Sequence, residues 1–173
     1  MAKWYEALAT VTVGSGGSAN IEFTSIPQTY TDLKIVLSAR VTNNDSLHYG
    51  PAYITLNGNT SAIYDNTRLM GYATTVLSAQ DQNQTSLAIA VNGSSSTTTS
   101  FSINNYYFTN YTSSNNKSIS NEYAIETNST TNNLMAIVAM LANTTSAISS
   151  IKIAAASGQT FVEYTTATIY GIR

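Results

Sequence analysis

Short segments in which apolar and polar residues alternate run along most of the chain, separated by stretches rich in Ser, Thr, Asn and Gly. A period of two sends successive side chains to opposite faces, which is typical of a half-buried β-strand. The clearest example is 32–41. There Leu33, Ile35 and Leu37 share one face, whereas Lys34 points the other way. The pattern predicts an all-β chain.

Each expected strand is bounded by turn-forming residues. Gly14–Ser18 predicts the turn of a hairpin between the first two strands, and Asn57-Gly58 predicts a tight turn because both residues tolerate positive φ. The Ser/Thr-rich stretch 93–100 is expected to be a mobile exposed loop. The expected strands are 8–13, 21–23, 32–41, 51–56, 62–64, 68–72, 86–91, 99–108, 117–125, 133–141, 147–154 and 160–172.

The stretch 133–141 is the one place where a helix competes, because Leu, Met and Ala favour helices. Its short length and its central Ile137-Val138 pair favour a buried strand instead. Many short strands with short connections predict an antiparallel two-sheet β-sandwich of the jelly-roll type, with a barrel as the less favoured alternative.

The domain organisation follows from the absence of a long linker. Residues 8–173 are expected to form a single β-sandwich domain, and residues 1–7 an N-terminal arm. Trp4 and Tyr5 in this arm either staple the first sheet or dock on a neighbouring subunit, and we favour docking. The N-terminus does not resemble a secretory signal, and no apolar run is long enough to span a bilayer.

The composition of the chain disfavours several classes of functional site. The 173 residues carry a formal charge of -2 and include no Cys, so a disulfide framework, a thiolate metal site and a phosphate-binding surface are all disfavoured. The seven Lys and Arg residues are scattered and are expected to be solvated surface charges, which argues against nucleic acid as a partner. We expect no membrane partner, no cofactor and no metal.

Catalytic candidates are few. His48 is the only His, and it lies in a polar stretch with no nucleophile motif nearby. Glu122 and Glu126 share strand parity, but nothing in the sequence pairs them across a cleft as a glycosidase requires. Calcium ligation by Asp45 or Asp65 lacks the spacing of a known loop. The chain is therefore predicted not to be an enzyme.

Tyrosine is the one residue type that suggests a binding surface, with 12 copies in the chain. Aromatic rings anchor protein interfaces and stack on sugars at low entropy cost. Tyr106, Tyr107 and Tyr111 form the densest group, and alternation sends Tyr106 and Tyr107 to opposite faces, so that at least one belongs to the core. The candidate protein-interface residues are Trp4, Tyr5, Tyr106, Tyr107 and Tyr111.

Four segments resemble a pattern found in virion proteins of tailed phages, particularly marine and cyanobacterial ones. Together they frame most of the chain from Ile21 to its end, and the first and last are the most specific. A Trp of that pattern is absent here, its place being taken by 134–141. The segments are FTSIPQTYTDLKIVLSAR (23–40), NYTSSNNKS (110–118), AISSIKI (147–153) and ATIYGI (167–172).

The resemblance implies a β-sandwich on the outside of a phage particle, made in the host cytoplasm. Our first hypothesis is a capsid decoration or cement protein that forms a homo-oligomer, with a trimer favoured, and binds the major capsid protein or other virion subunits. The alternative is a receptor-binding module of a tail or head fibre that recognises host polysaccharide. A depolymerase is a third hypothesis, and it depends on the scattered carboxylates alone.

Overall fold

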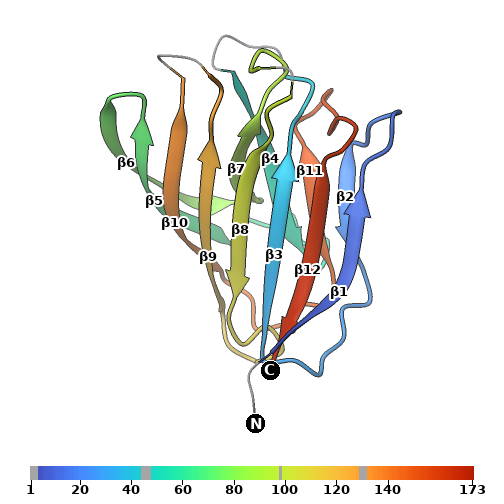
Figure 1. The fold of residues 1–173 in the computed structure, drawn as a ribbon. Coiled ribbons are helices and arrows are strands. Elements are labelled where there is room, and N and C mark those ends of the chain that lie inside the picture. The colour runs from blue at the N-terminus through green and yellow to red at the C-terminus, as the bar shows by residue number, and fades with distance from the viewer. Residues whose placement is uncertain (1–3, 44–47, 98, 129–131) are drawn as a thin grey trace.

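The computed structural model describes residues 4–43, 48–97, 99–128 and 132–173. In these residues the chain forms twelve β-strands and no helix (Figure 1), which confirms the predicted all-β class. The strands are β1 (Tyr5–Thr12), β2 (Asn20–Phe23), β3 (Asp32–Ala39), β4 (Tyr49–Leu56), β5 (Tyr64–Tyr72), β6 (Thr75–Gln84), β7 (Leu87–Asn92), β8 (Ser102–Phe108), β9 (Lys117–Ile125), β10 (Leu134–Ala142), β11 (Ile151–Ala155) and β12 (Thr166–Ile172).

The strands form two antiparallel sheets that pack face to face, as predicted for a β-sandwich (Figure 1). The large sheet has eight strands in the order β1-β12-β3-β8-β9-β10-β5-β6. The small sheet has four, in the order β2-β11-β4-β7. The large sheet therefore extends beyond the small one, and its extra strands are β9, β10, β5 and β6.

The jelly-roll order becomes plain when these four extra strands are set aside. The remaining eight strands pair first with last, second with seventh, third with sixth and fourth with fifth, as β1·β12, β2·β11, β3·β8 and β4·β7. This nesting of strand pairs is what a jelly roll produces when one long hairpin folds into two sheets. We call these eight strands the frame.

The extra strands are two hairpins inserted into the frame. β5 and β6 follow β4 and are joined at Tyr72 and Thr75, where the intervening Ala73 has a positive φ of 49°. β9 and β10 follow β8 and pair along their whole length. Because β10 also pairs with β5, the two hairpins continue the large sheet outward from β8 to β6. We call β9, β10, β5 and β6 the inserted half of the large sheet.

The core lies between the sheets and follows the predicted alternation. Leu33, Ile35 and Leu37 of β3 are fully buried, and Ile54 and Ile153 of the small sheet are buried with them in one cluster. Each such side chain contributes about 1.5–3 kcal/mol by leaving water. The predicted alternation along β3 is thus confirmed, and the frame is held by close packing of its inner faces.

Local pairing was predicted incorrectly at the start of the chain. β1 and β2 do not form a hairpin across Gly14–Ser18, since β1 pairs with β12 and β2 with β11 in the other sheet. β1 also begins at Tyr5, so residues 5–7 belong to the sandwich rather than to a separate arm. In a jelly roll, strands that are adjacent in sequence cross between sheets, and their partners come from distant segments.

Other elements differ from the prediction in smaller ways. In place of the predicted strands 62–64 and 68–72 there is one strand, β5, which runs from Tyr64 to Tyr72 and leaves out residues 62 and 63, and β6 was not predicted at all. The stretch 133–141 is a strand, as favoured over a helix, although only one of its faces is buried. The Asn57-Gly58 turn is confirmed by positive φ at both residues, 53° and 67°.

Two cations expected to be solvated are buried instead. Arg40 is 5% exposed and Lys117 is fully buried, and burial lowers the pKa of both side chains. Lys117 donates to the carbonyl oxygens of Ser113 and Asn115, so backbone oxygens rather than carboxylates solvate its charge. These cations therefore hold loops in place.

Arg40 holds the stretch that was predicted to be a mobile exposed loop. Its Nη1 donates to Ser96 Oγ and to the carbonyl oxygens of Thr97 and Ser100, at 2.9, 2.6 and 3.1 Å. Its Nη2 donates to the carbonyl oxygens of Ser94 and Ser96, at 2.9 and 3.0 Å. Because Ser96 is itself buried, this part of the loop belongs to the packed frame.

Candidate functional site

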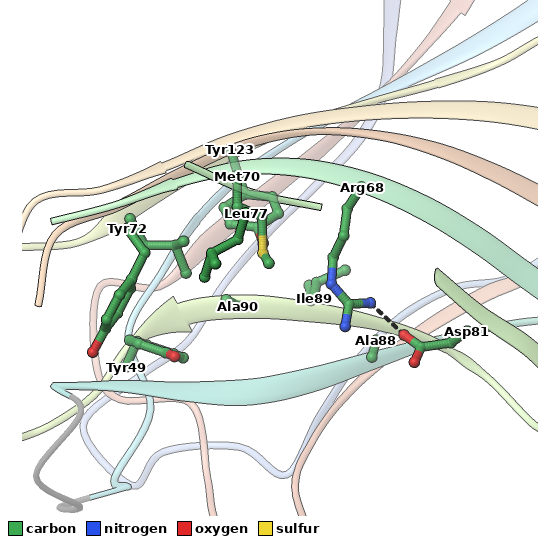
Figure 2. Close-up of a pocket in the computed structure, with 11 residues that line it drawn as sticks. Tyr49, Arg68, Met70, Tyr72, Leu77, Asp81, Ala88, Ile89, Ala90 and Tyr123 are labelled. Atoms are coloured by element: carbon green, nitrogen blue, oxygen red, sulfur yellow. Dashed lines mark hydrogen bonds and ion pairs between the residues drawn. The ribbon is translucent and has the colours of Figure 1, made fainter. Parts of the chain in front are cut away.

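A cleft of about 480 Å³ opens between the inner face of the inserted half and the edge of the small sheet (Figure 2). β5 and β6 form one wall, and β7, the edge strand of the small sheet, crosses the other (Figure 2). The volume lies in the range of about 300–1,000 Å³ that is usual for small-molecule sites. The lining residues are Tyr49, Arg68, Met70, Tyr72, Leu77, Asp81, Ala88, Ile89, Ala90, Tyr123 and Leu134.

Three tyrosines from three different strands meet in this cleft. Tyr49 of β4 and Tyr72 of β5 pack edge to face with their ring centroids 6.4 Å apart, at one end of the cleft (Figure 2). The Tyr72 hydroxyl donates to Asn132 Oδ1 at 2.8 Å. Tyr123 of β9 is 8% exposed, and burial raises the pKa of its hydroxyl. These rings give the cleft flat apolar surfaces that packing holds in place.

An ion pair lies farther along the cleft. Arg68 Nη1 donates to Asp81 Oδ2 (Figure 2). It also donates to Asn66 Oδ1, at 2.9 Å. Asn66 is buried and also donates to Asp81 Oδ2 at 3.3 Å. The hydrogen bond from Arg68 lowers the pKa of Asp81, so this carboxylate stays ionised at neutral pH. Together the three side chains form a fixed polar cluster with no net charge.

The lining of this cleft suits the binding of a ligand. Asp81 supplies the only carboxyl group among the lining residues, and glycoside hydrolysis needs two of them on opposite sides of the bond. A carboxylate with a lowered pKa is also a poor general acid near neutral pH. The cleft combines apolar walls with a few fixed polar groups, which is the usual composition of a ligand site.

A second surface, on the opposite face of the inserted half, is exposed and apolar. Two neighbouring cross-strand rows form it. Val76, Gly71, Met135, Ala124 and Ile103 stand in register from β6 to β8. In the next row Leu69 stands beside Ile137, and this apolar pair is flanked by Ser78 on β6 and Glu122 on β9. We call this surface the outer apolar face.

The large side chains of the outer apolar face are well exposed. Val76 is 75% exposed, Ile137 67% and Met135 63%. Gly71 leaves room for the Met135 side chain, whose Cγ would lie 3.4 Å from a Cβ placed on that glycine. Because these side chains are contiguous rather than scattered, they form the kind of surface that usually contacts another macromolecule.

The prediction that the tyrosine cluster forms an interface was wrong for two of its three residues. Tyr106 and Tyr111 are 1% and 0% exposed and lie in the core, so their rings cannot form an interface. The Tyr111 hydroxyl donates to the carbonyl oxygen of Pro27, which explains why a polar residue is tolerated there. Tyr107 points to the outer side of β8, opposite Tyr106, as alternation predicts, and donates to Asp32 Oδ2 at 2.7 Å.

Trp4 and Tyr5 staple the first sheet, the alternative that the sequence analysis ranked second. Arg173 stacks on Trp4, with its guanidinium carbon 5.0 Å from the ring centroid, and on Tyr30 at 4.9 Å. Tyr5 packs edge to face on Tyr170 at 6.5 Å. Both predicted side chains are 44% or more exposed, so a contact with a neighbour stays a prediction for them.

The catalytic candidates are not brought together. Glu122 accepts a hydrogen bond from Asn105 on the outer side of the large sheet, and Glu126 accepts one from the Asn128 backbone just after β9. Neither residue lines the cleft. The described residues hold no group of three or more His, Asp and Glu side chains placed to bind a metal ion. Asp45, the first calcium candidate, lies outside the described residues.

Sequence reasoning missed most of the cleft and of the outer apolar face. Leu77 and Asp81 lie on β6, which was not predicted, and Arg68 was taken for a solvated charge. One signal was available, because 134–142 is apolar at nearly every position. A strand buried on one face needs apolar residues only at alternate positions, so the second set marks an exposed apolar surface.

Comparison of the sequence with protein-family models and with curated proteins gives no match. Within the described part of the chain, no helix is long and apolar enough to cross a membrane.

Proposed function

We propose that this chain is a non-enzymatic structural protein of a tailed-phage virion, most simply a decoration or cement protein on the capsid surface. Its β-sandwich has jelly-roll strand order, an architecture common in viral capsid domains. The four sequence segments that resemble phage virion proteins support the same class. The proposal includes assembly as a homo-oligomer, with a trimer expected. The protein would be made in the host cytoplasm and carried on the virion surface.

The outer apolar face is the observation on which this proposal depends. It presents Leu69, Val76, Met135 and Ile137 together, and only 9% of the whole chain is charged. The core of a protein interface is depleted in charge, so docking there desolvates few ionic groups. We therefore assign the contact with a neighbouring virion subunit, the major capsid protein in the first instance, to this face.

The proposal is tested by cosedimentation of the purified protein with capsid shells that lack it. The double variant Met135→Thr/Ile137→Thr keeps strand-compatible residues but removes apolar surface, and we expect it to lose at least tenfold in affinity. The matched control is Val36→Thr, which changes the outer face of β3 in the other half of the same sheet. Equal binding by both variants would contradict the assignment.

A second candidate function is recognition of host polysaccharide by a fibre-borne receptor-binding module. The tyrosine-lined cleft favours it, because aromatic walls beside a fixed polar cluster suit a sugar ring. Binding to host cells separates the two functions. A cement protein binds capsid shells and ignores cells, whereas a receptor-binding module binds cells whether or not shells are present.

A further inference from the structure

We infer that the cleft between β5, β6 and β7 is a binding site for a neutral saccharide, held by its apolar ring face against tyrosine and by its hydroxyl groups on Arg68 and Asp81. The inference deepens the second candidate function, on which it rests, and assigns that function to particular residues. It does not depend on the outer apolar face, which lies on the opposite side of the inserted half.

The shape and apolar character of the cleft come first. Its volume of about 480 Å³ is large enough for a mono- or disaccharide. Tyr49 and Tyr72 project toward each other from opposite walls at one end (Figure 2). Met70 and Leu77 cover the wall between these rings and the ion pair (Figure 2). A pyranose ring has one face of C–H groups, and such a face packs well on the negative face of an aromatic ring.

Unused polar atoms at the ion pair come second. Among the described residues, Arg68 bonds through Nη1 and leaves Nη2 and Nε without a partner, and Asp81 bonds through Oδ2 and leaves Oδ1 without one. The Tyr123 hydroxyl also makes no hydrogen bond to any described residue, although it lies in the cleft lining. A planar donor pair, an acceptor and a hydroxyl are the groups that neighbouring sugar hydroxyls can satisfy together.

The charge balance selects a neutral ligand. The lining contains one cation, Arg68, and one anion, Asp81, and each neutralises the other. A phosphate or an acidic sugar on Arg68 would meet the Asp81 carboxylate, and a cationic ligand on Asp81 would meet the guanidinium. A polyhydroxyl ligand brings donors and acceptors without net charge, so it can use both groups.

The polar groups are held in place before any ligand arrives. Asn66 is 4% exposed and bonds to both members of the ion pair, which fixes their orientation. Binding then costs little side-chain entropy. A purely apolar ligand would instead desolvate Arg68 Nη2 and Nε and Asp81 Oδ1 without giving these atoms partners, which is unfavourable.

The test uses a glycan array that carries neutral and acidic glycans, probed with the labelled full chain. We expect binding to at least one neutral glycan, and titration calorimetry with that glycan should show about tenfold weaker binding for Arg68→Met and about fivefold for Tyr123→Phe. Tyr53→Phe, which deletes a hydroxyl outside the cleft, is the matched control and should bind like the wild type. Thermal melting of each variant confirms that it is folded.

Several results would overturn the inference. These are no binding to any neutral glycan on the array, binding only to acidic glycans, or neutral-glycan binding that the two cleft variants leave unchanged. The inference would also be overturned if the cleft bound no glycan but did bind the anionic aromatic dye 1-anilinonaphthalene-8-sulfonate, or a β-strand peptide along β7. Host-cell binding that persists in the cleft variants would keep the receptor function and reject this site, so the two failures are distinguishable.

Discussion

The two halves of the large sheet differ in what their faces offer. In the frame half, β1, β12, β3 and β8, the outer side makes polar contacts such as Thr10 with Thr168 at 2.9 Å and Tyr107 with Asp32, and Ile103 of β8 lies at the edge of the outer apolar face. In the inserted half, part of the outer side forms the outer apolar face, and the inner side lines a cleft. The frame carries the fold, and the inserted hairpins carry the surfaces that are suited to binding.

This division has a physical reason. The frame strands pair with partners that are distant in the sequence and enclose the core between two sheets, so their side chains are constrained by packing. The inserted hairpins pair along a sheet edge that the small sheet covers only in part. Their side chains can therefore change with less cost to the core, which is how loops and insertions commonly acquire function.

The largest difference between the halves should appear when the same side chain is truncated in each. Leu37→Ala, in the core of the frame, should lower the free energy of unfolding by about 2–5 kcal/mol because it leaves a cavity. Leu69→Ala, on the outer apolar face, should change it by about 0.5 kcal/mol or less. Urea denaturation of both variants measures the two changes in the free energy of unfolding. Similar losses of stability in both variants would contradict the difference between the halves.

The next effect concerns the buried cation of the frame. Arg40→Met should lower the free energy of unfolding by about 2–3 kcal/mol, because several carbonyl oxygens of the 93–100 loop lose their donor. Arg40→Lys should recover only part of the loss, since an ammonium cannot reproduce the planar set of donors. Faster hydrogen exchange in this loop should accompany the loss. An Arg40→Met protein as stable as the wild type would contradict this role.

A smaller effect is expected from a single hydrogen bond on the outer face of the frame. The bond to Asp32 raises the pKa of Tyr107 from 10.0 to about 12, so the folded state holds this proton more tightly than the unfolded state. Its stabilisation should be complete below pH 10 and be lost as the pH rises toward 12. The difference in free energy of unfolding between wild type and Tyr107→Phe should shrink over that pH range. A difference that stays constant up to pH 12 would contradict this role of the hydrogen bond.

The smallest effect on stability is expected from the variant used to test docking. Met135→Thr/Ile137→Thr should unfold within about 1 kcal/mol of the wild type, because both side chains are already exposed in the isolated protein. Guanidinium denaturation checks this independently of shell binding. A large loss of stability would show that these side chains support the fold, and it would remove the distinction between the two halves.

Strands were predicted correctly where a pattern within the strand itself marked them. Pairings between segments distant in the sequence were not predicted. β3 and β9 were predicted because strict alternation marks a strand with one buried face, and β9 has the predicted bounds. β6 was missed because it is an edge strand of mostly polar residues, with no buried face to leave a pattern. The β1–β2 hairpin was wrong because the true partner of β1 lies at the other end of the chain.

The candidate sites were harder to predict for the same reason. The cleft assembles Tyr49, Arg68, Asp81 and Tyr123 from four strands, and no segment of the sequence holds more than a part of it. Tyrosine density pointed instead to Tyr106 and Tyr111, whose rings fill the core. A cluster of aromatic residues in the sequence indicates packing as readily as binding, and only burial separates the two.

A cryo-electron microscopy reconstruction of the phage particle that we propose carries this chain tests the central claim most directly. We predict that β10, β5 and β6 turn Leu69, Met135 and Ile137 toward a neighbouring subunit of the capsid shell, while the outer face of β12 and β3 stays in solvent. A reconstruction in which the outer apolar face lies in solvent, or in which the chain occurs only at the tail, would contradict the account.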